Sequence, residues 1–441
     1  MLSKERLNRI LSLSLPIIGA MISQNVLNLV DTAMVGTLGN AALAAVGLGG
    51  FALFMFQALI LGISTGVQAT SSRRKGEGRF DRLAVPLNAA LLIVLLAAPV
   101  LSAFWYFLTP YIYPYLIADP EVIEQGVPYL QVRTLAIIFV GMNYSFRGYW
   151  NAVDHARLYM STLVVMHGLN IFLNYVLIFG HFGAPALGVY GAGLASAIAM
   201  MVGTGIYFFL GLRHAKGNGF LHGLPSRTEV FSLIRLSLPS SLQQLFFAAG
   251  FTATFWIIGQ VGTPELAAAN VLINVTLVAI LPGIGFGLAA ATLVGQALGR
   301  GNVADARQWG WDVTKVGIVA LGVLGIPMWL TPNLILGIFL HDPSTIELAQ
   351  IPMRLVGVLM ALEAVSLILM HGLLGAGDSR RVMVVSVSAQ WLLFLPLAYL
   401  AGPVLGFGLL GIWVLQGVYR SAQAIVFLGF WRGGRWANIS V

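Results

Sequence analysis

The stretch LSLPIIGAMISQ, residues 13–24, returns in altered form as LSLPSSLQQLFF at residues 236–247, so that Leu13 aligns with Leu236. The same offset, 223 in residue number, pairs LAA at 43–45 with LAA at 266–268, and it aligns Gly36 and Gly39 with Gly259 and Gly262. Farther along the chain the offset is 224, where RGYWNAVDHAR (147–157) aligns with HGLLGAGDSRR (371–381). A preserved order with a slowly changing offset indicates that one unit has been duplicated in tandem.

The composition assigns both copies to a membrane protein. Hydrophobic residues make up 58% of the 441 residues and charged residues only 9%, whereas soluble domains carry about 25% charged residues. A chain of this length has room for about a dozen spanning helices of roughly 20 residues each. There is no cysteine, which excludes disulfides and thiolate metal sites.

Twelve apolar segments are delimited by glycine, proline and charged residues, and we expect each of them to cross the membrane as a helix. They lie near 10–36, 44–71, 83–108, 127–150, 157–180, 188–212, 231–258, 266–296, 306–332, 347–376, 380–401 and 407–431. The first of them follows a basic start that resembles a signal peptide, but we interpret it as a spanning helix that stays attached.

The predicted fold is an all-α polytopic membrane protein with twelve transmembrane helices in two six-helix bundles. Because six is an even number, both copies enter the membrane from the same side, so a pseudo-two-fold axis along the membrane normal relates the bundles. We place the amino-terminal bundle at 1–212, a cytoplasmic linker at 213–230 and the carboxyl-terminal bundle at 231–441.

The basic residues predict the orientation. In the twelve-span arrangement, clusters such as Arg73, Arg74 and Lys75 all fall in loops on one side, and the opposite loops carry acids but no Lys or Arg. The positive-inside rule therefore places both termini in the cytoplasm, and we expect a multi-pass protein of the inner, or cell, membrane. The net charge of +8 is then a feature of the membrane surface, and we expect no nucleic-acid partner.

One carboxylate lies inside the first span. Gln24, Asn28 and Asp31 follow an i, i+4, i+7 spacing and so share a helix face. A charged Asp near the centre of a membrane helix costs ~2.5–3.5 kcal/mol, so Asp31 needs partners. At ~1.5 Å per residue Asp31 lies ~9 Å inside the outer boundary.

Polar residues of two other spans lie at a similar depth. Asn170 and Asn174 are on span five and Ser196 is on span six, ~9–12 Å inside the outer boundary for Asn174 and Ser196. Such a cluster can hold a proton, or a small hard cation such as sodium, through oxygen ligands, and we predict that it couples transport to that ion. The structural alternative is a neutral Asp31 that joins helices by hydrogen bonds.

Further candidates carry less specific signals. Pro16 removes a backbone hydrogen bond from span one and is a candidate hinge, although Pro239 at the repeat position favours a fixed structural kink. Glu363 in span ten is a candidate second acid, which Arg420 of span twelve could instead neutralise. Candidate substrate contacts are Met21, Met34, Met142 and Phe146, because flexible Met and aromatic surfaces suit varied ligands, although core packing or lipid contact would also place Met and Phe there. Asn28, on the helix face of Asp31, is a further candidate for the same cavity.

Four motifs resemble the MATE family, the multidrug and toxic compound extrusion transporters. They are DTAMVGTLGNAALAAVGL (31–48), RGYWNAVDHAR (147–157), GLNIFLNYVLIFG (168–180) and GAGLAS (191–196), and the resemblance extends over essentially the whole chain. The resemblance implies an antiporter that exports bulky, often cationic amphipathic compounds by alternating access, driven by protons or sodium ions. It implies no other cofactor, and we expect a monomer that contacts small-molecule substrates and the lipid bilayer.

The DinF-like branch of that family is the one this chain resembles most. The branch uses an acid on span one, polar residues on span five and a hydroxyl on span six, which correspond to Asp31, Asn170, Asn174 and Ser196. The resemblance also implies that Gln24 lines the same cavity, and it matches the span-one proline to Pro16. The other branches use a Glu on span seven, and residues 239–251 contain none. The second span-five position is often Asp in the branch, and the Asn174 found here favours protons over sodium because it leaves one carboxylate.

Other classes fit less well. A flippase for a lipid-linked saccharide, from the same wider superfamily, should line its cavity with several Arg or Lys for pyrophosphate. Away from the cytoplasmic ends of the spans, only Arg133, Arg354 and Arg420 are candidates here. A membrane enzyme would need a nucleophile, metal or base set, and no such motif occurs among the scattered histidines, so we predict that the chain is not an enzyme. A channel would need a filter motif, which is also missing.

Overall fold

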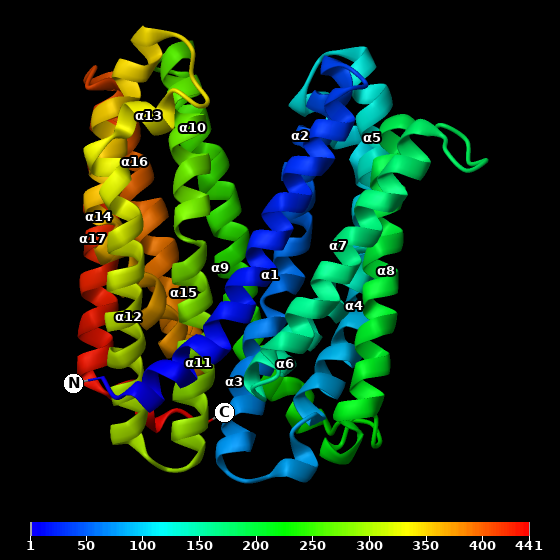
Figure 1. Ribbon diagram of the computed structural model, residues 1–441, viewed down its shortest axis with the longest axis vertical. Coiled ribbons are helices and arrows are strands. Elements are labelled where there is room, and N and C mark those ends of the chain that lie inside the picture. Colours follow the sequence, from blue (N-terminus) through cyan, green and yellow to red (C-terminus); the bar gives the residue numbers. More distant parts are fainter. Residues whose placement is uncertain (1, 441) are drawn as a thin grey trace. The chain divides into compact units, whose positions relative to one another are not determined.

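The computed structural model describes residues 2–440, and within this range it is built of helices without β-strands (Figure 1). Ten helical segments are long and apolar enough to cross a membrane. The two remaining predicted spans are α17 (Gly408–Gly433) and a helix pair, α5 (Pro120–Leu135) and α6 (Ile137–Ala152), in place of one straight span at 127–150. The predicted all-α polytopic fold is therefore confirmed.

Two compact units divide the chain. The amino-terminal unit comprises Gly19–Ser241, and the carboxyl-terminal unit comprises Met1–Ile18 together with Leu242–Val441. These limits differ from the predicted division at 212 and 231 because two long helices, α1 (Lys4–Gly36) and α9 (Arg227–Gly259), each begin in one unit and end in the other. Both helices have 33 residues, and they begin and end at positions that the sequence repeat aligns.

The amino-terminal unit packs its remaining helices around one apolar core. They are α2 (Asn40–Leu61), α3 (Ile63–Gly76), α4 (Val85–Leu116), the pair α5 and α6, α7 (Ala156–Phe179) and α8 (Gly188–His214). Figure 1 shows α7 running beside α8, and these two helices are in extensive contact. The core includes fully buried Leu87, Tyr149, Trp150 and Tyr207.

A glycine permits one close helix contact in this unit. Gly62 separates α2 from α3, and a Cβ atom at this position would collide with the backbone nitrogen of Ser241. Any larger residue would push α9 away from this junction, because packed interiors leave no room for an added methyl group. The helix break in predicted span two is therefore a packing feature.

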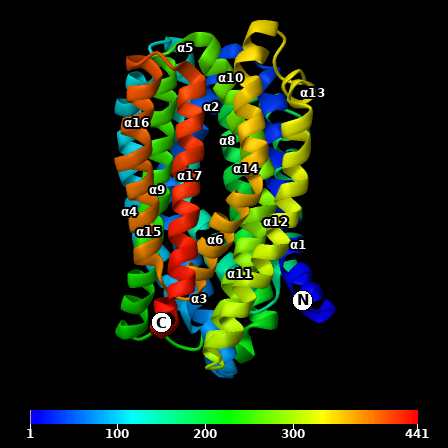
Figure 2. The same cartoon turned by 90° about the vertical axis from the view of Figure 1, so that its left-hand side faces the viewer.

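The carboxyl-terminal unit repeats this arrangement with α10 (Thr263–Ala279), α11 (Leu281–Gly299), α12 (Val303–Leu330), the short α13 (Pro332–Leu336) and α14 (Pro343–Gly375). Figure 2 shows α14 beside α12 and α17, both of which it contacts extensively. Predicted span eight is divided between α10 and α11 because Pro282, in the first turn of α11, has no N–H to continue the ladder of α10.

Predicted span eleven is irregular. It consists of α15 (Ser379–Ser388), π-helical turns at Ala389–Phe394 and Leu400–Val404, and α16 (Leu395–Tyr399) between them. Pro396 and Pro403 lie in or beside these turns and lack the N–H that an α-helix requires. The counterpart of α7 in the second repeat is therefore not one continuous α-helix, and the residue aligned with Asn174, at an offset of 222, is Pro396 in the short α16.

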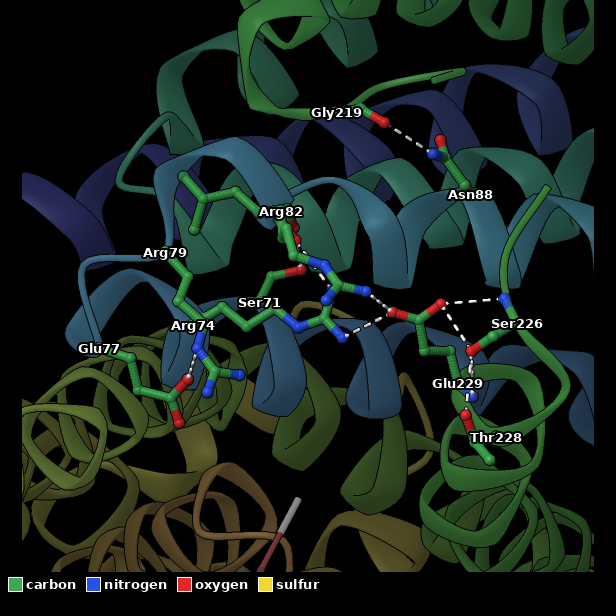
Figure 3. A network of polar contacts seen from close by, with 11 residues as sticks. Ser71, Arg74, Glu77, Arg79, Arg82, Asn88, Gly219, Ser226, Thr228 and Glu229 are labelled. Carbon is green, nitrogen blue, oxygen red and sulfur yellow. Dashed lines mark hydrogen bonds and ion pairs between the residues drawn. The ribbon is translucent and has the colours of Figure 1, made fainter. Parts of the chain in front are cut away.

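The predicted linker is an ordered segment. A 3-10 turn at Lys216–Asn218 is followed by a segment that forms two hydrogen bonds with Asn88 of α4. Asn88 Nδ2 donates to the Gly219 carbonyl at 2.8 Å, and Asn88 Oδ1 accepts from the Leu221 N–H at 3.0 Å. Figure 3 shows this segment's contact with Asn88 together with the start of α9, where Ser226 and Glu229 cap the helix reciprocally.

Candidate functional site

A polar seam joins α1 to α7 inside the amino-terminal unit. The i, i+7 spacing on each helix aligns two contacts, one at each end of the seam. At one end, the Asn174 Nδ2 donates a hydrogen bond of 2.5 Å to Asp31 Oδ1. At the other end, the His167 ring contacts Ser23 Oγ at 2.7 Å through Nδ1 and Gln24 Oε1 at 3.1 Å through Nε2. The two helices thus place the predicted acid against a span-five amide.

Between these ends lies the second predicted contact. Asn170 Nδ2 donates to Ser196 Oγ at 3.2 Å, which connects α7 to α8. The side-chain oxygens of Asn170 and Asn174 are buried and accept no hydrogen bond from residues 2–440. A buried acceptor without a donor is costly, and a proton carrier or a small cation would satisfy it. The structure therefore brings Asp31, Asn170, Asn174 and Ser196 into one neighbourhood.

A short chain of amides extends the seam along α1. Gln24 Nε2 donates to Asn28 Oδ1 at 3.1 Å, and Asn28 is exposed whereas Gln24 is half-buried. The predicted cavity residues Gln24 and Asn28 thus link the buried His167 to the surface of the unit. Met21 and Met34 are half-buried on the same helix. This exposure agrees with side chains that line a cavity, and it agrees equally with side chains that pack against neighbouring helices.

Two of the predicted cavity residues lie elsewhere. Phe146 is fully buried in the core, where its ring stacks on Tyr207 at 5.4 Å and meets Phe208 and Phe220 edge-on. Phe146 therefore belongs to the core of this unit. The sequence pattern of α6 does not by itself distinguish a core aromatic residue from one that lines a cavity. Met142 is half-buried and packs against the same core.

The structure adds two residues to the seam that were not predicted, Ser23 and Arg133. Ser23 contacts His167, and the i, i+3, i+7 spacing of His167, Asn170 and Asn174 already places these three residues on one face of their helix. Arg133 of α5 lies near enough to Asp31 to interact with it electrostatically. No local sequence pattern relates α5 to α1.

The second repeat has no acid at the position of Asp31. The repeat offset of 223 aligns Asp31 with Thr254, whose Oγ1 donates to the Gly250 carbonyl of its own helix at 2.8 Å. A neutral contact elsewhere joins α9 to α15, where Gln243 Nε2 donates to Ser386 Oγ at 3.2 Å. Glu363 of α14 instead forms an ion pair of 3.1 Å with Arg420 of α17. Of the two alternatives for Glu363, a second functional acid or an acid neutralised by Arg420, the structure shows the ion pair that the second requires.

Pro16 lies inside α1, close to the point where the helix passes from one compact unit to the other. Pro239 occupies the same place in α9. The hinge role of Pro16 stays a prediction.

The donor set limits the chemistry of the seam. Within residues 2–440 no group of three His, Cys, Asp or Glu side chains is arranged to hold a metal ion. An ion at Asp31 would therefore depend on one carboxylate together with amide and hydroxyl oxygens, a set that suits a proton or a weakly held monovalent cation better than a transition metal.

Comparison with known proteins agrees with this architecture. The MatE family profile matches residues 16–176 and again residues 239–400, and the two matches start at Pro16 and Pro239, which the sequence repeat aligns. Among curated proteins, the chain is 26% identical to "Probable multidrug resistance protein NorM" of Thermotoga maritima, over 98% of this chain and 93% of that protein. It is 28% identical to the protein of the same name from Pseudomonas aeruginosa, over 97% and 90%.

Solved structures show the same fold. A multidrug resistance MATE family transporter in an outward-facing conformation superposes with a TM-score of 0.90 at 22% identity, over 98% of this chain and 96% of that chain. A MOP superfamily transporter from Pyrococcus furiosus superposes with a TM-score of 0.85 at 23% identity, over 96% and 95%.

Proposed function

The chain belongs to the MatE family of membrane transporters, and from this we propose that it is a secondary active multidrug exporter. It exchanges amphipathic, often cationic organic compounds for protons or sodium ions by alternating access. We place it in the DinF-like branch, as a monomer in the inner membrane with both termini in the cytoplasm. Small amphipathic or cationic molecules are its substrates, and no cofactor besides the coupling ion is required.

The hydrogen bond between Asp31 and Asn174 is the observation that carries the proposal. It holds a carboxylate between α1 and α7, beside two buried amide oxygens that have no donor among the described residues. When a proton or a sodium ion binds, the charge of Asp31 is neutralised and the α1–α7 contact changes its partners. A ligand that favours one arrangement of these helices then shifts the equilibrium between conformations.

A lipid-linked saccharide flippase is the alternative from the same superfamily, and no observation favours it. Such a protein needs free cationic side chains for a pyrophosphate. Of the three arginines expected within spans away from the cytoplasmic ends, Arg420 is neutralised by Glu363 and Arg133 lies near Asp31. Arg354 alone does not make a cationic cavity.

Transport in inverted membrane vesicles tests the proposal. A fluorescent organic cation is supplied outside, and an imposed pH gradient or sodium gradient drives its uptake. We expect Asp31→Asn to reach the membrane at wild-type levels and to lose gradient-driven uptake. The Asn side-chain amide is uncharged, so it has no negative charge for a proton or a sodium ion to neutralise. Glu124→Gln, which removes an exposed carboxylate elsewhere in the same unit, is the matched control and should transport normally.

The gradient that drives uptake identifies the ion. Normal transport by Asp31→Asn would remove the coupling role of this residue. Failure of Asp31→Asn to fold would support the structural role, in which the carboxylate only joins helices.

A further inference from the structure

Two long helices each begin in one compact unit and end in the other. The first half of α1, up to Ile18, belongs to the carboxyl-terminal unit, and the first half of α9, up to Ser241, belongs to the amino-terminal unit. The repeat offset of 223 aligns Ile18 with Ser241. Each unit therefore contains the first half of a helix from the other repeat, as protomers exchange an identical element in domain swapping.

The two exchanged helix halves meet the same feature of the unit that receives them. A Cβ atom added to Gly285 of α11 would touch Ile18 Cγ1, and a Cβ atom added to Gly62, between α2 and α3, would touch Ser241 Oγ. The offset of 223 also aligns Gly62 with Gly285. Because both repeats place a glycine against the same turn of the incoming helix, shape at this contact does not decide which helix half each unit receives.

The start of α1 docks through a cation. Arg6 Nη1 lies 2.8 Å from Asp305 Oδ1, and Arg6 Nε lies 2.6 Å from Asp312 Oδ2. All three residues belong to the carboxyl-terminal unit. The Asp312 side chain is 1% exposed, and a buried carboxylate needs partners of opposite charge. The surface that receives the start of α1 is therefore acidic.

The start of α9 docks through an anion. Glu229 Oε1 lies 2.7 Å from Arg82 Nη2 and 3.3 Å from Arg74 Nη2, and Figure 3 shows both guanidinium groups directed toward this carboxylate. All three residues belong to the amino-terminal unit. The surface that receives the start of α9 is therefore basic.

The repeat alignment relates the two docking contacts with their charges inverted. The offset of 223 aligns Arg6 with Glu229, and it aligns Arg82 with Asp305. Each of these aligned positions carries a basic residue in one repeat and an acidic residue in the other. The helix start and the surface that receives it are both inverted, so the two observed contacts each join opposite charges.

A third aligned pair has the same property. The offset aligns Glu77 with Arg300, and Arg300 lies beside the docking contact of α1, where its Nη2 is 3.0 Å from Asp305 Oδ2. One aligned pair of the helix starts, Lys4 and Arg227, keeps its sign, but both of these side chains are exposed. The inversion therefore occurs at the positions that form ion pairs in or beside the two docking contacts.

A helix half that docked on its own repeat would meet like charges. Arg6 would lie against the two arginines that bind Glu229, and Glu229 would lie against the two aspartates that bind Arg6. We infer that this inversion of charge directs the first half of each helix to the unit of the other repeat, by excluding the docking that shape permits. The inference concerns how the fold is assembled, so it depends neither on the transported compound nor on the coupling ion.

Engineered disulfides report the docking partner directly, because the chain contains no native cysteine. Ile18→Cys with Gly285→Cys reports the observed docking of α1, since the contact above brings the two Cβ atoms to the roughly 3.5–4.5 Å that a disulfide spans. Ser241→Cys with Gly285→Cys reports the alternative, in which α9 docks on its own repeat. Copper phenanthroline oxidises the full-length protein in membranes, and mass spectrometry of the digested chain measures the yield of each disulfide.

Exchange of the two charges on the helix starts should redirect the docking. Arg6→Glu with Glu229→Arg preserves the net charge, makes both observed contacts like-charged and makes both own-repeat contacts complementary. We expect the yield of the disulfide between positions 18 and 285 to fall about tenfold or more, because removing the cation from one buried pair alone exceeds the free energy of a tenfold change. The disulfide between positions 241 and 285 should appear.

A second exchange should reverse this result. Adding Asp305→Arg and Arg82→Glu returns each cluster to its original numbers of positive and negative charges. The disulfide between positions 18 and 285 should then return, and the one between positions 241 and 285 should be lost. Glu5→Arg with Arg227→Glu is the matched control, since it makes the same exchange at exposed positions of the same two helices and should change neither yield.

The two yields separate a directing role of the charges from a local one. An unchanged yield between positions 18 and 285 in the variant with exchanged helix starts would overturn the inference. A fall in that yield without the disulfide between positions 241 and 285, or a fall that the second exchange does not reverse, would also overturn it. In both of those cases the charges would contribute only to local stability.

Discussion

Replacing Arg6 by Met removes the guanidinium that attaches the start of α1 to α12. Arg6 contacts three residues of one α12 face: its Nη1 and Nε bind Asp305 and Asp312, and its Cζ lies 3.6 Å from the centre of the Trp309 ring. The unbranched Met side chain keeps part of the apolar contact with the ring. The change therefore removes mainly the two ion pairs.

The magnitude depends on burial. Asp312 is 1% exposed, and breaking a buried pair by removing one partner costs about 3–5 kcal/mol. Gln308 at 2.8 Å and Lys315 at 3.7 Å remain as partners of Asp312, so the lower end of that range, about 3 kcal/mol, applies. The pair with Asp305 is 23% exposed on both sides and contributes about 0.5 kcal/mol or less.

Thermal unfolding of the detergent-purified protein, followed by tryptophan fluorescence, measures the effect. About 3 kcal/mol corresponds to a melting temperature lower by about 6–12 °C for a unit of this size. Arg300→Met is the matched control, since Arg300 also pairs with Asp305 at 3.0 Å but is 47% exposed, and its loss should cost about 0.5 kcal/mol or less. Glu229→Gln should cost only about 1 kcal/mol, because its pairs are more exposed and Gln keeps the helix cap. If Arg6→Met melted no lower than Arg300→Met, the assignment of a buried ion pair to Asp312 would be refuted.

Two more expectations concern stability. Gly62→Ala places a methyl group against the backbone of Ser241 and should destabilise the amino-terminal unit by about 1–3 kcal/mol. Gly50→Ala is the control and should not destabilise the unit, because the space around Gly50 is open. Equal melting temperatures of the two variants would contradict the packing argument. Burial, followed by the charges of Lys75 and His214, lowers the pKa of the folded-state His155 below its ordinary 6.5. The stability that depends on a neutral His155 is therefore complete above about pH 6.5, and it is lost as the pH falls through the lower pKa of the folded state. The melting temperature of the wild type should therefore fall more steeply between about pH 7 and pH 5 than that of His155→Gln, and parallel pH profiles would contradict this assignment.

The seam at Asp31 illustrates what could be predicted. Helical periodicity placed Gln24, Asn28 and Asp31 on one face, and depth along the helix placed Asn174 and Ser196 level with it. Both arguments are local, because rise and turn per residue are properties of the helix itself. The position of Arg133 near Asp31 could not be predicted, since it depends on how α5 packs against other helices.

The sequence by itself determined the duplicated all-α membrane fold, because hydropathy, helical period and the internal repeat depend only on the order of residues along the chain. Tertiary structure alone decided that Phe146 belongs to the core, that Glu363 is paired with Arg420, and that the first halves of α1 and α9 are exchanged between units. These features depend on which helix faces meet. In an apolar chain many faces are similar, and their pairing is selected only by the packing and charge of the assembled bundle.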